Sequence, residues 1–290
     1  MASATVADPR SAATDVVKKI SSIATLPEVT ARIIQTVEDP RSSAASLHKI
    51  ISHDPALVTR ILKVVNSAFY GLPGQIASIE RAIVLLGLNA VKNIAVAASL
   101  GQLFRGVKLC EGYTARDLWT HCVSVGAAAR ELARQMRIPL NDEAFLAGMI
   151  HDTGLLVSLQ LFPEKTHAVC ESARAGGGPF IELERSAIGL DHQQLGQALA
   201  EQWKFPRSCQ LVAGFHHNPV ALSDSNRLLV TLVYVADTLC CQGGFGFNLT
   251  ALNQSLEDGG LDDLDLSRSV INRLRESLPA LAEEAKTIFA

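Results

Sequence analysis

The chain has 290 residues, of which 48% are hydrophobic and 19% charged, so it has ample material for a folded core and is not disordered as a whole. Its net charge of −3 excludes a general electrostatic grip on nucleic acid or on an anionic membrane, because both need a basic surface. A local basic patch remains compatible with this balance. Aromatic residues make up only 5% of the chain, so we expect an aliphatic core.

Helical periodicity and capping residues predict an all-α fold of two helical lobes. Residues 1–14 are rich in Ala, Ser and Thr and are expected to be disordered. Residues 15–110 form the first lobe, a bundle of short helices. One of them starts at Asp54–Pro55, with Asp as the N-cap and Pro in the first helical position, and Ser78 caps another. The helices expected in this lobe span residues 16–23, 27–37, 43–51, 55–65, 79–86 and 89–104.

The second lobe is expected over residues 111–241. Its first helix begins after Thr114, with Asp117 three residues later completing a capping box. The helices expected here span residues 114–136, 142–150, 154–161, 163–174, 181–188, 192–204, 206–217 and 223–241.

A C-terminal helical extension is expected over residues 242–290. It comprises a loop rich in Gly and Phe, an acidic stretch from Glu257 to Asp265 that is typical of a solvated loop, and two helices in the last forty residues. No part of the chain has the alternation that would predict a sheet.

Cysteine usage and hydropathy indicate a cytoplasmic protein. No two of the six cysteines are spaced as CxxC, and a chain of this length needs no disulfides, so reduced thiols are expected. The first ten residues lack the apolar run of a signal peptide. The apolar stretch over residues 82–103 is interrupted by Asn89, Lys92 and Asn93, which favours buried helices over a membrane span.

The eight histidines are distributed unevenly. Five lie in the second lobe near helix ends or beside acidic residues, and Asp237 lies inside a strongly apolar helix, where an unpaired carboxylate would be costly. Imidazole nitrogens and carboxylate oxygens together are ligands for divalent metals, and the set is large enough for two ions that share Asp152. With no thiolate in the set, Fe, Mn or Mg is favoured over structural Zn. The predicted metal ligands are His121, His151, Asp152, His192, His216, His217 and Asp237.

Structural roles that need no metal are alternatives for several of these residues. Asp117 is accounted for by the capping box, and His151 with Asp152 could instead form a polar knot that ties helices together. His121 taken alone is more typical of a satisfied core histidine. The other three histidines, His48, His53 and His167, are expected to make surface or local hydrogen bonds.

The run from Ala147 to Leu156, Ala-Gly-Met-Ile-His-Asp-Thr-Gly-Leu-Leu, resembles the signature of the HD superfamily of metal-dependent phosphohydrolases. Over about residues 20–240 the chain resembles one branch of it, the HDOD domains, which are HD-related output domains of bacterial signalling. The stretches that carry this resemblance are Leu26–Val29, His53–Leu57, Asn66–Gly71, Ser78–Ala82, Leu118–His121, Gly189–His192, Leu195–Gly196, Trp203–Pro206 and His216–His217.

HDOD domains are similar to HD-GYP phosphodiesterases, which hydrolyse cyclic di-GMP at a metal centre. The resemblance implies that the metal positions of those enzymes fall on the seven residues above, with Asp117 in place of a glutamate ligand. Two features depart from the enzymes. Leu155 occupies the lysine position of the pattern His-Asp-x-Gly-Lys, and Asn218-Pro219-Val220 replaces the Glu and GYP loop. A phosphate-facing cation is therefore missing.

The resemblance implies a non-catalytic signal-transduction module that binds other signalling proteins. A relict pocket between helices of the second lobe would take a metal or a nucleotide second messenger. The alternative is a metal-dependent phosphohydrolase acting on cyclic dinucleotides or nucleotides, in which Asp152 bridges the ions and orients an activated water. Nucleic-acid binding by the first lobe is a third, weaker hypothesis, which the net charge of −3 opposes.

Overall fold

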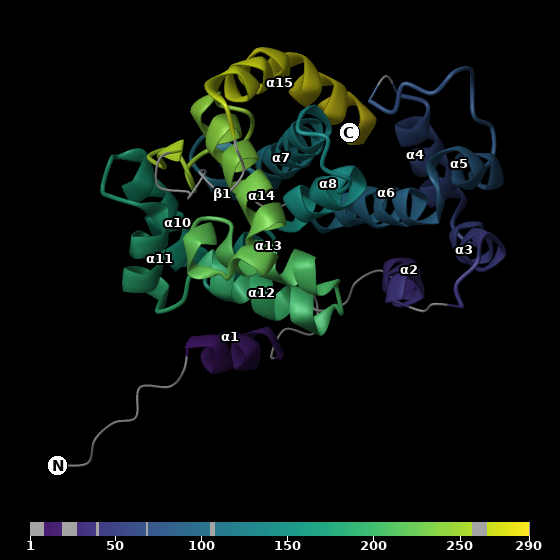
Figure 1. Cartoon of the computed structure of the whole chain (residues 1–290). Helices are drawn as coiled ribbons and strands as arrows, with labels where there is room; N and C mark the ends of the chain where they lie inside the picture. Colours follow the sequence, from purple (N-terminus) through teal and green to yellow (C-terminus); the bar gives the residue numbers. More distant parts are fainter. Residues whose placement is uncertain are drawn as a thin grey trace.

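The computed structural model of the chain describes residues 9–18, 28–38, 41–67, 69–104, 108–256 and 266–289. The acidic stretch 257–265 and residues 1–8 lie outside the described part. Within it the fold is all-α, as predicted, apart from a two-stranded antiparallel ribbon of β1 (Lys108–Cys110) and β2 (Tyr113–Thr114), which follows the first lobe in the sequence and packs beside α10 (Pro163–Arg174) of the second (Figure 1). Strands this short show no periodicity, so the sequence pattern did not reveal them.

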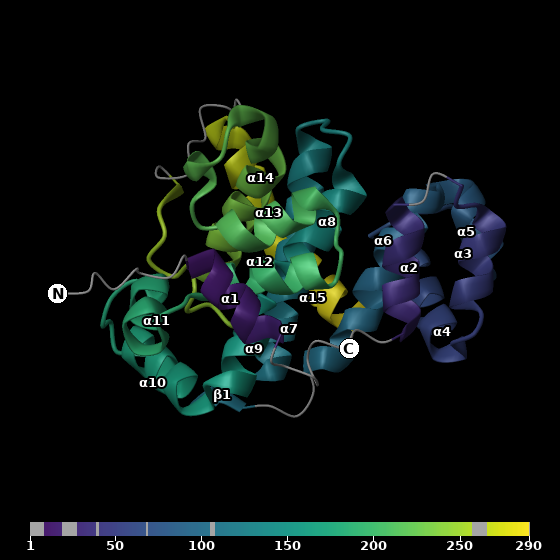
Figure 2. The same cartoon turned by 90° about the horizontal axis from the view of Figure 1, so that it is seen from below.

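The first lobe is a bundle of short helices whose boundaries follow the predicted caps. The Asp54 carboxylate accepts a hydrogen bond from the Leu57 amide at 2.9 Å, and the Ser78 hydroxyl accepts one from the Arg81 amide at 3.2 Å. Figure 2 shows α2 to α5 gathered to one side of the molecule. The lobe comprises α2 (Glu28–Glu38), α3 (Ala44–Ile51), α4 (Pro55–Val65), α5 (Ile79–Leu86), α6 (Leu88–Leu100) and a 3₁₀ turn at Gly101–Phe104.

Helix α6 joins the two lobes. From Ala90 to Leu100 it is buried at nearly every position, which is the pattern of a helix enclosed on all sides. It packs on α2, α4 and α5 of its own lobe and on α8 of the second. The second lobe comprises α7 (Ala115–Gln135), α8 (Asn141–Ile150), α9 (Gly154–Leu161), α10 (Pro163–Arg174), α11 (Phe180–Ile188), α12 (His192–Gln202), α13 (Arg207–Phe215), a 3₁₀ turn at Pro219–Ala221 and α14 (Asp224–Gln242).

The first helix, α1 (Pro9–Lys18), differs from expectation in two ways. It begins inside the stretch predicted to be disordered, and it packs against α12 of the second lobe although residue 15 onward had been assigned to the first (Figures 1 and 2). Ala13 and Val17, four residues apart, are fully buried. This short apolar stripe explains the ordering, because an isolated helix of ten residues is marginal in water without tertiary packing.

A single helix, α15 (Arg268–Phe289), occupies the described part of the last forty residues, where two helices were predicted. Pro279 lies inside it and removes one backbone hydrogen bond. The helix nevertheless continues, and its apolar stripe is buried and packs on α7. It also reaches the first lobe, because the Phe69 amide donates to Glu284 Oε1 at 2.6 Å and Lys63 Nζ donates to the Thr287 carbonyl at 2.7 Å. The buried stripe consists of Leu274, Leu278, Ala282 and Ala285.

We expect the substitution Leu274→Ala to lower the free energy of unfolding by about 2–5 kcal/mol, since it empties a fully buried site on α15. Val84→Ala, at a side chain that is 72% exposed, is the control and should change stability by less than about 0.5 kcal/mol. Chemical denaturation of both variants provides the measurement. Equal stability losses would show that α15 is not part of the cooperative fold.

One helical stretch, Asn141–Leu161, is long and apolar enough to cross a membrane by length and composition alone. It covers α8 and α9, and 89% of its most apolar window is buried inside the fold. The stretch therefore has the character of a core segment of a soluble domain. The apolar residues of α6 from Ala90 to Leu100 are likewise buried, as predicted, whereas Val84 and Leu85 of α5, in the same predicted stretch, are exposed.

Candidate metal centre

The seven residues predicted as metal ligands come together in the interior of the second lobe; we call them the His/Asp cluster. Five helices contribute. His121 lies on α7 and Asp237 on α14, His151 and Asp152 follow the end of α8, His192 opens α12, and His216 and His217 follow α13. Six of the seven side chains are completely buried and the seventh, His217, is 5% exposed. Burying charged and polar side chains is unfavourable unless they are paired. These side chains must therefore be stabilised by one another or by a bound ion.

The cluster divides into two groups of converging donor atoms. One consists of Asp152, His192, His216 and His217, and the other of His121, His151 and Asp237. Asp152 faces both, since its Oδ1 lies 3.4 Å from His216 Nε2 and 3.5 Å from His192 Nε2, while its Oδ2 lies 3.4 Å from His151 Nε2. Metal bonds of about 2.0–2.2 Å put neighbouring ligand atoms about 3.0–3.5 Å apart. The spacing therefore fits one ion in each group, with Asp152 between them.

Four of the imidazoles are held so that Nε2 points inward. Their Nδ1 atoms face acceptors, namely the carbonyls of Phe245, Gly148 and Val212 for His121, His151 and His216, and the Glu184 carboxylate for His192. A hydrogen bond from Nδ1 fixes the tautomer and leaves the Nε2 lone pair free for an ion. The same arrangement holds metal-binding histidines in place in general.

Several buried atoms of the cluster have no hydrogen-bond partner, which is rare in protein interiors. They are His151 Nε2, Asp152 Oδ1, His216 Nε2 and Asp237 Oδ2. One cation in each of the two groups would satisfy all four atoms. The donor set and these unpartnered atoms therefore fit a divalent metal better than a closed knot of hydrogen bonds.

The electrostatics of the cluster also suit a cation. Burial alone would raise the pKa of Asp152, but His151 and the other imidazoles hold this pKa well below its usual range. The pKa of Asp237 is likewise lowered against the effect of burial, first by the hydrogen bond with His121. Burial lowers the pKa of His216. Burial and the neighbouring His216 together hold the pKa of His217 well below its usual value. At neutral pH the carboxylates are ionised and these two imidazoles are neutral, as metal ligands must be.

His151 and His192 differ, because their pKa values are raised despite burial, which by itself would lower them: Asp152 raises that of His151, and that of His192 is about 9. For His192 the cause is the neighbouring Glu184 carboxylate, followed by Asp152. Its Nε2 lies 3.0 Å from His217 Nε2. Without an ion, a proton on His192 fills this space between two nitrogens; a metal in the same group would take the place of that proton.

Sequence reasoning missed the residues that hold the ligands in place. Glu184 on α11 is buried and accepts hydrogen bonds from both His192 Nδ1 at 2.6 Å and the His192 amide at 3.0 Å. The sequence does contain a sign of this role. Glu184 lies on the same helical face as Phe180 and Ile188, where an apolar residue is expected. Gln193 accepts from the His217 amide at 2.9 Å, and Gln254 Oε1 lies 2.7 Å from His217 Nδ1.

A loop over residues 243–256, here the covering loop, closes the cluster from outside. The Phe247 amide donates to the Asp117 carbonyl at 3.0 Å, and Thr250 Oγ1 lies 3.5 Å from Asp152 Oδ2. Gly246 has a φ of +80° and lies so close to α7 that an added Cβ would meet the His121 amide at 2.5 Å. Only glycine permits this approach. The covering loop therefore seals the side of the cluster formed by α7 and α14.

The remaining predicted positions behave as expected. Asp117 completes the capping box of α7, with its carboxylate accepting from the Thr114 amide at 2.7 Å, and it is not one of the converging groups. Leu155, at the position of the missing lysine, is fully buried. None of the described hydrogen bonds or ion pairs of the seven cluster side chains involves Lys or Arg. His48 lies 2.9 Å from Glu80, and His167 bonds the Lys108 carbonyl at 3.0 Å, so both make the local contacts predicted.

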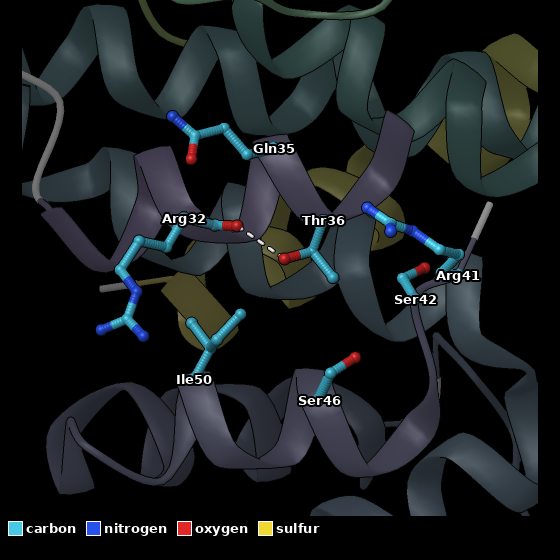
Figure 3. Close-up of a pocket in the computed structure, with 7 residues that line it drawn as sticks. All are labelled: Arg32, Gln35, Thr36, Arg41, Ser42, Ser46 and Ile50. Atoms are coloured by element: carbon cyan, nitrogen blue, oxygen red, sulfur yellow. Dashed lines mark hydrogen bonds between the residues drawn. The ribbon is translucent and has the colours of Figure 1, made fainter. Parts of the chain in front are cut away.

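A solvent-open polar pocket lies elsewhere, between α2 and α3 of the first lobe (Figure 3). Its volume is about 290 Å³, and Figure 3 shows Arg32 and Arg41 on its two sides with Thr36 between them. The buried Lys92 contacts two of its lining residues, donating to the Thr36 carbonyl at 2.9 Å and to Ser42 Oγ at 2.8 Å. The pocket thus combines basic and hydroxyl groups, whereas the His/Asp cluster is closed.

A family model of the HDOD domain matches residues 23–219, more than half of the chain. A curated protein from Treponema pallidum (strain Nichols), described only as uncharacterized, is 26% identical over 229 residues. The aligned part covers 78% of this chain and 44% of that protein, so the chain spans less than half the length of this relative.

Solved structures share the fold at low sequence identity. An HDOD domain protein of unknown function from Geobacter sulfurreducens is 22% identical with a TM-score of 0.73, covering 94% of this chain and 98% of its own. A candidate phosphohydrolase from Shewanella amazonensis SB2B is 23% identical with a TM-score of 0.72, covering 96% and 98%. A candidate signal transduction protein from Marinobacter aquaeolei VT8 is 23% identical with a TM-score of 0.74, covering 97% and 66%.

Proposed function

The chain belongs to the HDOD domain family, and on that premise we propose that it is a signalling module that acts by binding other proteins and turns over no substrate. One observation carries the proposal: the His/Asp cluster is sealed from solvent, with exposures of 0 to 5%. A phosphohydrolase must admit a phosphate ester to its metal-activated water. It also gains much of its rate from cations at the transferring phosphoryl group, and the corresponding position here is the buried Leu155.

We further propose that the cluster binds divalent metal in a closed, structural role. The ligands would be the seven residues of the cluster, with Asp152 shared between the two groups. Fe or Mn suits the mixed nitrogen and oxygen donors better than Mg does, because imidazole is a poor ligand for Mg. A metal held there would tie α7, α8, α12, α13 and α14 to one point, and so stabilise the surface that the second lobe presents to a partner.

Glu184→Gln should weaken metal binding by about 10- to 100-fold. The neutral amide removes the negative charge that faces His192 Nδ1, which orients the ring and makes it a stronger ligand. Glu182→Gln, at an exposed residue of the same helix, is the matched control and should leave affinity unchanged. Competition against a chelator of known affinity measures both. Equal metal affinities in the two variants would show that Glu184 does not support the metal ligands.

The proposed function is tested by giving the whole chain cellular proteins to bind and nucleotide substrates to hydrolyse, under the same conditions. Immobilised protein should retain particular cellular proteins in stoichiometric amounts, while the metal-loaded protein releases no product from cyclic dinucleotides or nucleotides. Turnover without any retained protein would contradict the proposal.

A second function, metal-dependent phosphohydrolysis, is favoured by one observation, the complete ligand set with Asp152 facing both groups. Opening of the covering loop would be needed to admit a substrate. His151→Ala should then abolish turnover, and turnover that persists in this variant belongs to a contaminant.

We propose that a nucleotide second messenger would bind in the α2–α3 pocket and not in the sealed cluster. Arg32 and Arg41 line this pocket, and guanidinium groups form bidentate hydrogen bonds with phosphate. We also propose that the module is cytoplasmic, since all six cysteines are free and buried, as in a reducing compartment.

A further inference from the structure

We propose that a metal ion reaches the His/Asp cluster beside His217, and that Gln254 closes this route as part of a gate formed by the end of the covering loop, residues 252–256. The proposal rests on the metal centre proposed above and adds to it a path for the ion. Gln254 is a positioning residue in this proposal, because it holds His217 and controls metal exchange without binding the metal itself.

His217 is the cluster side chain that reaches solvent. The side chains of the other six predicted ligands are 0% exposed, whereas that of His217 is 5% exposed. Its Nε2 lies 3.0 Å from His192 Nε2, inside the group that contains Asp152. A buried metal site needs an entry path, and we therefore place it at His217.

The Gln254 side chain connects His217 to α14. Its Oε1 lies 2.7 Å from His217 Nδ1, and its Nε2 donates to Thr238 Oγ1 at 2.5 Å. A hydrogen bond from Nδ1 to the amide oxygen leaves the Nε2 lone pair of His217 for an ion. One amide group thus orients a ligand and fastens the loop to the helix beside it.

The start of the covering loop is anchored by burial, whereas its end is not. Phe247 is fully buried, and the centroid of its ring lies 5.2 Å from that of Tyr113 and 6.0 Å from that of Phe180. Residues 252–256 are all exposed or half-buried, and Leu252 is 41% exposed. Segments with few buried apolar contacts open at the lowest cost. We therefore expect the end of the loop to open while its start stays in place.

Polar contacts with α14 hold the end of the loop closed. In addition to the contact of Gln254 with Thr238, the Tyr234 hydroxyl donates to the Ser255 carbonyl. Gln242 Nε2 donates to the Gln254 carbonyl at 3.2 Å. Each hydrogen bond adds a small net stabilisation to the closed loop. Loss of one of them should make opening more frequent in the metal-free and the metal-loaded protein alike.

The rates of Mn²⁺ exchange with the whole chain test the proposal. Release is followed after mixing the loaded protein with an excess of a chromophoric chelator, and uptake after mixing metal-free protein with Mn²⁺. Tyr234→Phe removes one closing hydrogen bond and no proposed ligand. It should raise both rates by the same factor, about 2- to 10-fold, and leave the Kd unchanged. Asn253→Ala, at an exposed residue of the same loop, is the control and should leave both rates unchanged.

Gln254→Ala should raise the rate of release more than the rate of uptake. The variant opens the gate and also removes the acceptor that orients His217, so the Kd should rise by about 10- to 100-fold. This difference distinguishes Gln254, which both closes the route and positions a ligand, from Tyr234, which only closes it.

The gate and the metal centre can fail separately. Equal rates in Tyr234→Phe and Asn253→Ala would overturn the gate and leave the metal centre standing, as would a Tyr234→Phe variant that speeds release alone. A chain that takes up no Mn²⁺ would overturn the metal centre and the gate with it. Should Tyr234→Phe or Gln254→Ala fail to fold, Thr238→Val removes the contact of Gln254 with α14 and should again raise both rates equally.

Discussion

Asp152→Ala should lower the free energy of unfolding by about 3–5 kcal/mol and abolish metal binding. The carboxylate is completely buried and lies within 3.4–3.8 Å of four imidazoles, those of His121, His151, His192 and His216. Its removal leaves these groups without their shared negative partner, which is the costly way to break a buried ionic contact. Chemical denaturation and elemental analysis of the purified variant measure the two effects.

The matched control is Asp224→Ala, at the exposed start of α14, where the carboxylate forms only a surface ion pair with Arg227. It should cost at most about 1 kcal/mol and leave the metal content unchanged. If Asp152→Ala were as stable as this control, the His/Asp cluster would not hold the second lobe together.

Gly154→Ala should be the most damaging single-methyl change in the second lobe, costing about 3 kcal/mol and weakening metal binding with it. An added Cβ would collide with the His192 carbonyl and lie 2.6 Å from the Gly196 amide, so α9 would have to move away from α12. His192 opens α12, and its Nε2 lies 3.5 Å from Asp152, so the movement also separates two ligands. Thermal unfolding with and without added metal is the measurement.

Gly196→Ala is the control on the facing helix. Its added Cβ would lie 3.3 Å from the Gly154 amide, a tight contact that small shifts can relieve. We expect a clearly smaller loss of stability than for Gly154→Ala. Similar losses in the two variants would mean that the α9–α12 contact tolerates displacement and does not position His192.

The sequence predicted the helices, their caps and the composition of the cluster because these depend on local signals. A capping box is a property of four adjacent residues, and the caps at Asp54, Ser78 and Thr114 are all formed. The seven cluster residues could be gathered because an ionisable group inside an apolar helix, such as Asp237, requires partners.

The features that escaped prediction depend on contacts between distant segments. The packing of α1 on α12 rests on two small residues, Ala13 and Val17, whose burial no local pattern reveals. Two helices were expected in the last forty residues, yet α15 continues through Pro279 while packed on α7. Only a loop rich in Gly and Phe was expected at the start of the covering loop, and the contacts of Thr250 and Gln254 with the cluster were not predicted because they join distant segments.

One measurement tests most directly whether the His/Asp cluster is a metal-binding but non-catalytic centre. The whole chain is loaded with Mn²⁺ or Fe²⁺, its metal content is determined, and the same sample is incubated with cyclic dinucleotides and assayed for hydrolysis products. We expect bound metal and no hydrolysis product above the level in buffer alone. Turnover by the loaded protein that is lost on His151→Ala would contradict it.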